Sequence, residues 1–149
     1  MATVKEILSR KSAQVFTTPV TSSVLDAIHF MNDERIGALV VTDAGRVAGM
    51  FTERDVLRRV VVAKLDPAKI TIGDVMTASV ISCTPCTSIE EVSRVMMKER
   101  VRHVPVLDEN GALRGLISIG DINAYRVSDQ EATINYLHSY IHGPELATA

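Results

Sequence analysis

The sequence predicts a mixed α/β fold in which two copies of a β-α-β-β-α unit pack sheet to sheet about a pseudo-two-fold axis. The first observation is a repeated motif: residues 49–55 read GMFTERD and residues 115–121 read GLISIGD. Both have Gly, two apolar residues, a hydroxyl residue, two variable residues and Asp. The second is that the same order of helix and strand signals precedes each motif. The third is physical: one unit cannot bury its apolar sheet face alone, whereas two stacked units can.

The first copy begins with an extended run over residues 15–19, which a proline ends. A helix is predicted over about 23–34, where Ser23 can cap the first turn. Residues 38–51 read as a hairpin with a turn at 43–45, and a helix should follow to about residue 63. The helix rests on apolar residues at helical spacing, namely Val24, Ala27, Ile28 and Met31.

The second copy repeats this order 65 or 66 residues later, and the one-residue shifts fall in loops. An extended run covers 81–85, and a helix opens at 87–90. A hairpin covers 104–118 with an Asn-Gly turn signal at 110–111, and a further helix begins at about 119. The apolar face of the first of these helices consists of Ile89, Val92 and Met96.

These signals divide the chain into four parts. The first repeat covers residues 4–63 and opens with a short helix over 3–9; a linker covers 64–76, and the second repeat covers 77–127. Residues 128–149 have no counterpart in the first half. Their apolar pattern predicts a C-terminal helix over about 129–141, ended by Gly143-Pro144.

Composition narrows the class of protein. The net charge is −2 with both signs mixed along the chain, so nucleic acid and anionic membranes are not predicted partners. No apolar run approaches the roughly 18 residues that span a bilayer, and the N-terminus lacks the apolar centre of a signal peptide. A cytoplasmic protein is therefore expected. Aromatic residues are 4% and tryptophan is absent, so the core must be aliphatic.

Neither a redox role for the cysteines nor a metal-binding role for the histidines is favoured by the sequence. Cys83 and Cys86 form a Cys-x-x-Cys pair, which can be a redox pair at a helix start. The alternative is ordinary strand and turn residues, and the repeat favours it because Cys83 aligns with Thr17. One such pair cannot complete a four-ligand zinc site. No metal site is predicted, since the remaining histidines lack partners at ligand spacing, namely His29, His138 and His142.

With the motifs at 49–55 and 115–121, and with residues 74–77 (DVMT) and 101–106 (VRHVPV), the chain resembles the cystathionine-β-synthase (CBS) domain family. It looks like a stand-alone tandem pair, or Bateman module, over residues 4–127. The resemblance implies a regulatory sensor and not an enzyme. Such pairs bind adenosine-containing ligands (AMP, ADP, ATP or NAD) in clefts between the repeats, need no cofactor, and regulate an enzyme, transporter or channel. A homodimer is the implied assembly.

The resemblance also implies roles for the motif residues. Asp55 and Asp121 would each accept hydrogen bonds from the two ribose hydroxyls, since a carboxylate has two acceptor oxygens. Thr52 and Ser118 would offer a hydroxyl and a helix N-terminus to a phosphate. The structural alternative is that these four residues only cap their helices, and both roles can hold together.

The resemblance implies that basic residues before the strand reach the phosphate, and on this basis the phosphate contacts are expected to differ between the two clefts. Arg102 and His103 should reach the phosphate of a nucleotide held at Asp55. Their first-repeat equivalents are Gly37 and Ala38, which carry no charge, so the cleft of Asp121 is expected to be weaker or empty. Two further residues should border the adenine, namely Thr18 and Thr84.

Two other functions stay open. One is a dimerisation scaffold that keeps the fold without binding a ligand, in which the aspartates are caps only. The other is a small thiol oxidoreductase that uses the Cys-x-x-Cys pair. No other catalytic set is found: there is no Ser-His-Asp spacing, phosphate loop or cleft with paired carboxylates.

Overall fold

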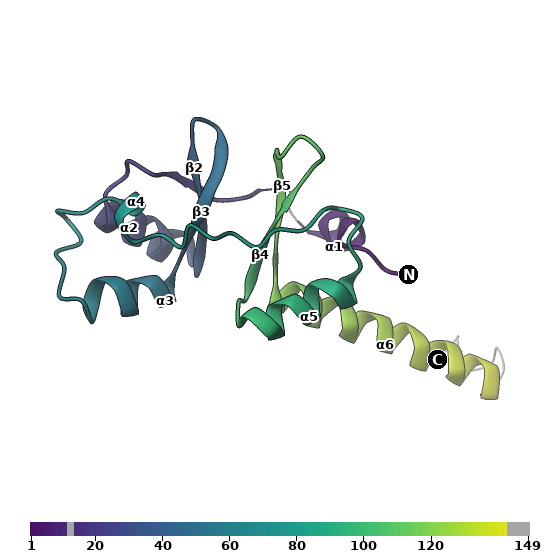
Figure 1. The fold of residues 1–149 in the computed structure, drawn as a ribbon. Coiled ribbons are helices and arrows are strands. Elements are labelled where there is room, and N and C mark those ends of the chain that lie inside the picture. Colours follow the sequence, from purple (N-terminus) through teal and green to yellow (C-terminus); the bar gives the residue numbers. More distant parts are fainter. Residues whose placement is uncertain (12–13, 143–149) are drawn as a thin grey trace.

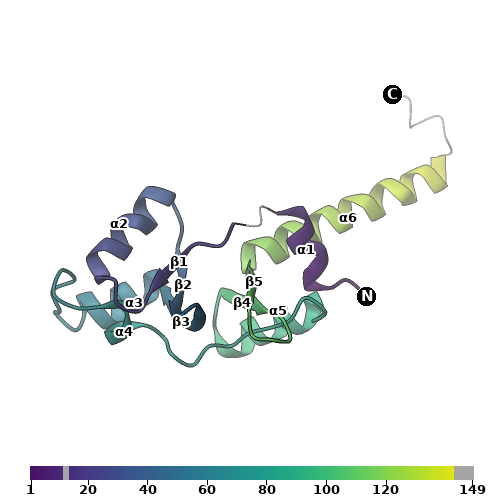
Figure 2. The same ribbon diagram turned by 90° about the horizontal axis from the view of Figure 1, so that it is seen from above.

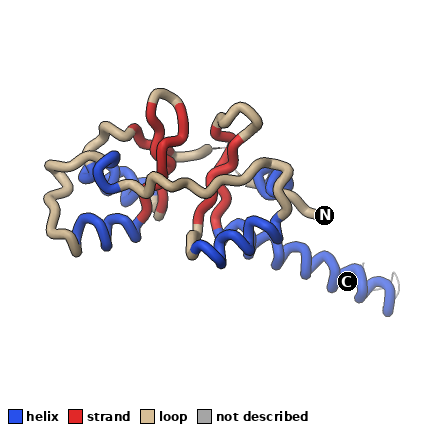
Figure 3. Tube along the Cα trace, viewed as in Figure 1, coloured by secondary structure: helices blue, strands red, loops and turns tan. Residues whose placement is uncertain are grey.

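The computed structural model describes residues 1–11 and 14–142. Strands lie in the middle of the molecule and helices toward its two ends (Figure 3). In chain order the elements are α1 (Val4–Arg10), β1 (Thr17–Pro19), α2 (Val24–Glu34), β2 (Ala38–Asp43), β3 (Arg46–Thr52), α3 (Glu53–Asp55), the π-helical η1 (Val56–Val61), α4 (Ile72–Val75), α5 (Ile89–Glu99), β4 (His103–Leu107), β5 (Leu113–Ser118) and α6 (Ile119–His142) (Figure 1).

The strands form one small sheet in each repeat. In the first repeat the order is β1-β2-β3, with β1 parallel and β3 antiparallel to β2. In the second repeat β4 and β5 pair antiparallel. The expected strand over 81–85 is reduced to a parallel bridge between Cys83 and Val106. This bridge takes the place of β1 in the second repeat. The amide of Cys83 donates to Pro105 O, and the amide of Leu107 donates to Cys83 O. Since neither bond needs an N–H on Pro105, the proline costs the bridge no hydrogen bond.

The apolar residues form a core in each repeat and a third cluster between the sheets. Ala38, Val40 and Met50 are buried against Leu113 and Leu116 of the second repeat. The predicted sheet-to-sheet packing of two α/β repeats is therefore confirmed. Of the largest fully buried side chains in the described residues, Phe51 alone is aromatic and the others are Leu, Ile and Val, in keeping with an aliphatic core.

The short helices α1 and α4 each complete the repeat that lies further from them in the sequence. Val4 and Ile7 of α1 are buried in the core of the second repeat, whereas Ile72 and Val75 of α4 are buried in the core of the first. Figure 2 shows α1 beside α6, away from β1 to β3. Backbone bonds repeat the exchange: the amide of Val4 donates to Thr87 O at 2.9 Å, and the amide of Ile72 donates to Ser22 O at 2.9 Å.

This exchange explains the glycine that opens each motif. A Cβ on Gly115 would lie 2.6 Å from Leu8 Cδ2, at the end of α1. A Cβ on Gly49 would lie 2.7 Å from the backbone oxygen of Thr77 and 2.8 Å from Met76 Sδ, just after α4. Each glycine therefore lets an exchanged helix lie directly against a strand.

Besides the strand expected over 81–85, three elements differ from the sequence prediction. The predicted linker over 64–76 contains the helix α4. The helix after Thr52 changes at once into the π-helical η1 and ends at Val61. The helix expected over 129–141 is not separate, because α6 runs without a break from Ile119 to His142. The predicted stop at Gly143-Pro144 lies outside the described residues.

Candidate ligand cleft between the repeats

A cavity of about 290 Å³ lies between the two repeats, and we call it the interrepeat cleft. It brings together two of the predicted site residues, His103 and Ser118, with Gly37 and Ala38 of the first repeat. These residues come from the facing ends of strands: His103 pairs with Ser118 across β4 and β5, and Ala38 begins β2. The full lining is Lys11, Gln14, Val15, Phe16, Ile36, Gly37, Ala38, His103, Leu116 and Ser118.

At the edge of this cleft Ser118 and Asp121 form a reciprocal cap at the start of α6. The amide of Ser118 donates to Asp121 Oδ2 at 2.9 Å, and the amide of Asp121 donates to Ser118 Oγ at 3.0 Å. Lys11 donates from Nζ to the same Oδ2 at 2.7 Å and to Leu116 O at 2.8 Å. Among the described residues no hydrogen bond falls on Oδ1, which leaves one carboxylate oxygen available to a ligand.

The surroundings of Asp121 favour its ionised form, and those of His103 favour the neutral imidazole. Burial by itself would raise the pKa of Asp121, but hydrogen bonds from Lys11 and Ser118 outweigh it and lower the pKa below its usual value. Burial also lowers the pKa of His103, partly opposed by the negative charge of Asp121. Since an ordinary histidine has a pKa of about 6.5, His103 is neutral at pH 7, and Lys11 is the cation of the interrepeat cleft.

Asp55, at the same motif position in the first repeat, has a different environment. Its side chain is 7% exposed, compared with 22% for Asp121. One oxygen accepts from the amide of Thr52 at 3.0 Å. The other accepts from Thr77 Oγ1 at 3.1 Å and lies 3.5 Å from Arg59 Nε. Each oxygen of Asp55 thus accepts a bond, one from Thr52 at the start of α3 and one from Thr77, just after α4.

The structure corrects the predicted contrast between the clefts. His103 was expected beside Asp55, but it lines the interrepeat cleft with Ser118, next to Asp121. The side of Asp121 was expected to lack a cation, but Lys11 supplies one at 2.7 Å. Arg102 is exposed, and its carbonyl accepts from the amide of Ile119 at 2.9 Å.

Lys11 was missed because it belongs to the first half of the sequence but lies against the second repeat. A signal for it exists. Residues 3–8 (TVKEIL) and 71–76 (TIGDVM) share threonine, an apolar residue, a variable residue, an acid and two apolar residues. That similarity marks α1 and α4 as equivalent, and it would have placed the residues after α1 beside the motif of the second repeat.

The two threonines predicted to border the adenine do not line the interrepeat cleft. Thr18 is buried in β1, where it pairs with Val41. Thr84 is exposed, and its hydroxyl lies 3.2 Å from Thr87 Oγ1 in the turn before α5. In the described chain the side chain of Thr84 therefore serves the turn.

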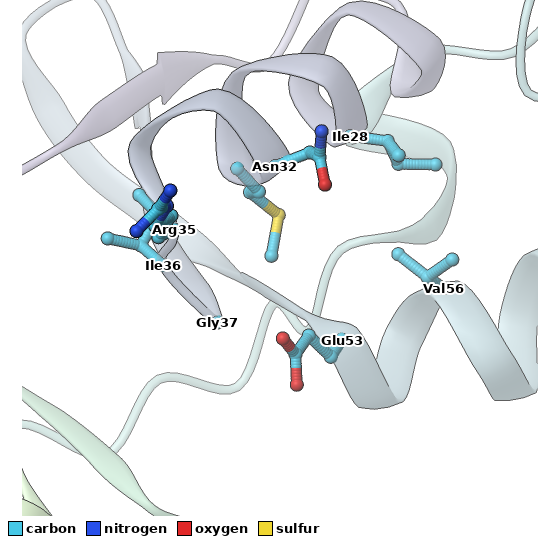
Figure 4. Close-up of a pocket in the computed structure, with 8 residues that line it drawn as sticks. Ile28, Asn32, Arg35, Ile36, Gly37, Glu53 and Val56 are labelled. Carbon is cyan, nitrogen blue, oxygen red and sulfur yellow. The ribbon is translucent and has the colours of Figure 1, made fainter.

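A larger cavity, of about 470 Å³, lies inside the first repeat between α2 and α3 (Figure 4). None of the predicted site residues lines it. Its polar side chains are Asn32, Arg35 and Glu53, and the Glu53 carboxyl lies 3.4 Å from where a Cβ on Gly37 would be. This cavity thus holds one cation, Arg35, as well as the acid Glu53.

The thiols and the remaining acids give no support to redox or metal chemistry. Burial, together with the charge of Glu91, raises the pKa of Cys83 to about 11, so its thiolate is scarce at neutral pH. Cys83 and Cys86 are both free. Within the described ranges, no three side chains of His, Cys, Asp or Glu gather as a metal site would require. No helix in those ranges, α6 included, is both long and apolar enough to cross a bilayer.

Comparison with known proteins agrees with this architecture. The model of the CBS domain matches residues 4–62 and 72–128. The CBS domain-containing protein CBSX3, mitochondrial, of Arabidopsis thaliana is 35% identical over 126 residues; the match covers 81% of this chain and 61% of that protein. This chain thus spans less than two thirds of that relative.

Solved structures show the same fold. A putative signal-transduction protein with CBS domains from Burkholderia ambifaria has a TM-score of 0.83 at 39% identity, covering 87% of this chain and 96% of its own. The CBS domain pair of protein MJ0100, in complex with 5′-methylthioadenosine and S-adenosyl-L-methionine, has a TM-score of 0.76 at 24% identity, covering 87% and 98%. The second likeness concerns the fold alone. With both repeats matched by the family model, the chain belongs to the CBS domain family and contains one tandem pair of CBS domains.

Proposed function

We propose that this CBS pair is a regulatory module that binds an adenosine-containing ligand in the interrepeat cleft, beside Asp121. The observation that carries the proposal is that Lys11 and Ser118, which line a cavity shared by both repeats, both hydrogen-bond to the Asp121 carboxylate at the N-terminus of α6. A carboxylate suits a ribose, and an ammonium group and a helix N-terminus suit a phosphate.

Each feature has a chemical role in this proposal. Oδ1 of Asp121 accepts from a ribose hydroxyl, while Oδ2 keeps its bond to the amide of Ser118. An ammonium group has three donors, and Lys11 uses two of them in the free protein. The third donor can reach a phosphate oxygen, and the positive end of the α6 dipole adds to the attraction.

The proposal reverses the order of the two aspartates expected from the sequence. At Asp55, a ribose would have to displace the bonds from Thr77 or Thr52, or the contact with Arg59. At Asp121, no hydrogen bond from the described residues falls on Oδ1, so a ribose hydroxyl can bind there without displacing one of them. We therefore place the tighter site at Asp121.

Ligand class and output follow from the same proposal. The candidates are AMP, ADP, ATP, NAD and S-adenosyl compounds, because all carry a ribose on adenine. In this proposal the module works in the cytoplasm as a homodimer, and it regulates an enzyme or a transporter. Catalysis is not part of the proposal, since the thiol with the raised pKa is a poor nucleophile.

A thermal-shift screen with these ligands tests the proposal. A ligand that binds only the folded chain adds about 2.7 kcal/mol of stability at 100 times its dissociation constant. At least one adenosine ligand should therefore raise the melting temperature of the wild type, and the rise should shrink in Lys11→Met if the ligand is anionic. No shift with any candidate at millimolar concentration would contradict the proposal.

One observation favours a second function, a scaffold that associates without a ligand. Both oxygens of Asp55 accept bonds from the protein itself, one from Thr52 in the helix cap and one from Thr77. If Asp121 also acts only as a helix cap, the molar mass of the assembly measured by sedimentation will be the same with and without AMP, and no ligand will bind.

A further inference from the structure

Helix α6 extends well beyond the body of the molecule. Its first turns contact α1, α5 and β5, and Ile122 is its one buried residue in the described chain. Beyond these turns the helix projects away from both repeats (Figures 1 and 2). The CBS family model ends at residue 128, so this half of α6 is a feature of this chain and not of the repeat.

The projecting half carries an apolar stripe with the spacing of a coiled coil. Val127, Ile134, Leu137 and Ile141 follow one another in steps of seven, three and four residues. They occupy the a and d positions of a heptad repeat. All four are exposed, between 48% and 70%. The stability of a helical extension of this length is marginal in water unless it packs against a partner. We therefore expect another helix to cover the stripe.

We propose that the partner is α6 of a second copy of this chain, paired in parallel through this stripe. The charges beside the stripe decide the orientation. Arg126 occupies a g position and Glu131 the following e position. In a parallel pair, Arg126 of each copy faces Glu131 of the other, which gives two attractive pairs. In an antiparallel pair, g positions face g positions and e positions face e positions, so Arg126 no longer meets Glu131 and both attractions are lost.

The polar residue within the stripe favours the same arrangement. Gln130 occupies the d position between Val127 and Ile134. In a parallel pair it meets Gln130 of the other copy in the same layer, where the two amides can hydrogen-bond and fix the register. Arg126 donates one hydrogen bond to Ser93 Oγ at 3.1 Å. A guanidinium has five N–H donors, so the bond to Ser93 leaves Arg126 able to pair with Glu131.

Disulfide trapping tests the orientation directly. Ile141→Cys is introduced into the full chain together with Cys83→Ser and Cys86→Ser, so that the new cysteine is the only thiol. The protein is then oxidised, and its mass is measured by mass spectrometry. Parallel pairing brings the two new cysteines together, so a covalent dimer is expected. Tyr136→Cys is the matched control: it is equally exposed, at 69%, but lies off the stripe and should give little dimer. No covalent dimer of Ile141→Cys, or equal trapping at both positions, would overturn the proposal.

Charge exchange tests the pairing without cysteine. Arg126→Glu and Glu131→Arg, each alone, replace two attractions with two repulsions and should weaken association about tenfold in sedimentation equilibrium. The double variant should restore it. Ile134→Asp should lower the molar mass of the assembly, whereas Tyr136→Asp should not. Circular dichroism confirms that each variant is folded. If Arg126→Glu, Glu131→Arg and Ile134→Asp all associate like the wild type, α6 does not pair in this way.

Discussion

At the scale of single residues, two aspartates at equivalent places in a repeated motif have become chemically different. Asp55 is nearly enclosed and accepts bonds on both oxygens, from Thr52 and from Thr77. Asp121 is more exposed and shares one oxygen with Lys11. The motif could be recognised from the sequence because its spacing is local. The environment could not, because Thr77 and Lys11 reach the two carboxylates from segments 22 and 110 residues away.

His103 should make the protein less stable in mild acid. Its pKa is lowered in the folded chain, mainly by burial, so the folded state binds the proton less readily than the unfolded state does. Stability is then full above the unfolded pKa of about 6.5 and falls as the pH drops below it. His103→Gln should lose less stability than the wild type between pH 7.5 and 5.5, as measured by urea unfolding. Equal losses would show that His103 does not titrate in this way.

At the scale of elements, most helices and strands were predictable from local signals. Helices α2 and α5 show apolar residues at helical spacing, and each hairpin shows a turn signal between two short apolar runs. Helix α4 has four residues, which is too short to show a period, and so its segment reads as a linker. The exchange of α1 and α4 between the cores depends on tertiary packing. The glycines at 49 and 115 could be seen in the sequence, but their purpose became clear only with Leu8 and Met76 beside them.

Gly115→Ala should destabilise the chain through its contact with α1. The added Cβ would lie 2.6 Å from Leu8 Cδ2, and overpacking of this kind costs about 1–3 kcal/mol. Because the clash is with the end of a side chain, Leu8→Ala combined with Gly115→Ala should show a coupling of at least about 0.5 kcal/mol in urea unfolding. Strictly additive effects would mean that the two residues do not touch.

Gly49→Ala is a sharper version of the same test. Its added Cβ would meet the backbone oxygen of Thr77 at 2.7 Å, and a backbone atom cannot rotate away as Leu8 can. We therefore expect it to cost more than Gly115→Ala in the same measurement. A smaller loss would place the exchanged segment after α4 further from β3 than the structure does.

At the scale of the whole molecule, the exchanged helices make each repeat depend on a segment from the other half of the chain. Val4 is fully buried in the second core although it stands at the start of the first half of the sequence. Val4→Ala should cost about 2 kcal/mol. In hydrogen exchange of the Val4→Ala variant, the amides of β4 and β5 should lose protection before those of β2 and β3. The opposite order would contradict the exchange of α1.

The same exchange accounts for what could be inferred about the site. The repeated motif pointed to the region between the repeats, and the structure places Ser118 and His103 on one cavity there. The cation was missed because Lys11 reaches the second repeat only when α1 has crossed to it. Ranking the two clefts from charges near each motif in the sequence therefore favoured Asp55, whereas our proposal, which takes Lys11 into account, places the tighter site at Asp121.

The most direct test of the ligand cleft is isothermal titration calorimetry of the tightest adenosine ligand with the wild type, Asp121→Asn and Asp55→Asn. A lost hydrogen bond to a charged group costs about 1.5–3 kcal/mol, so Asp121→Asn should bind roughly tenfold to a hundredfold more weakly. Asp55→Asn, confirmed as folded at the temperature used, should bind within about threefold of the wild type, well inside that margin. Unchanged binding by Asp121→Asn, with binding lost in Asp55→Asn, would contradict the account.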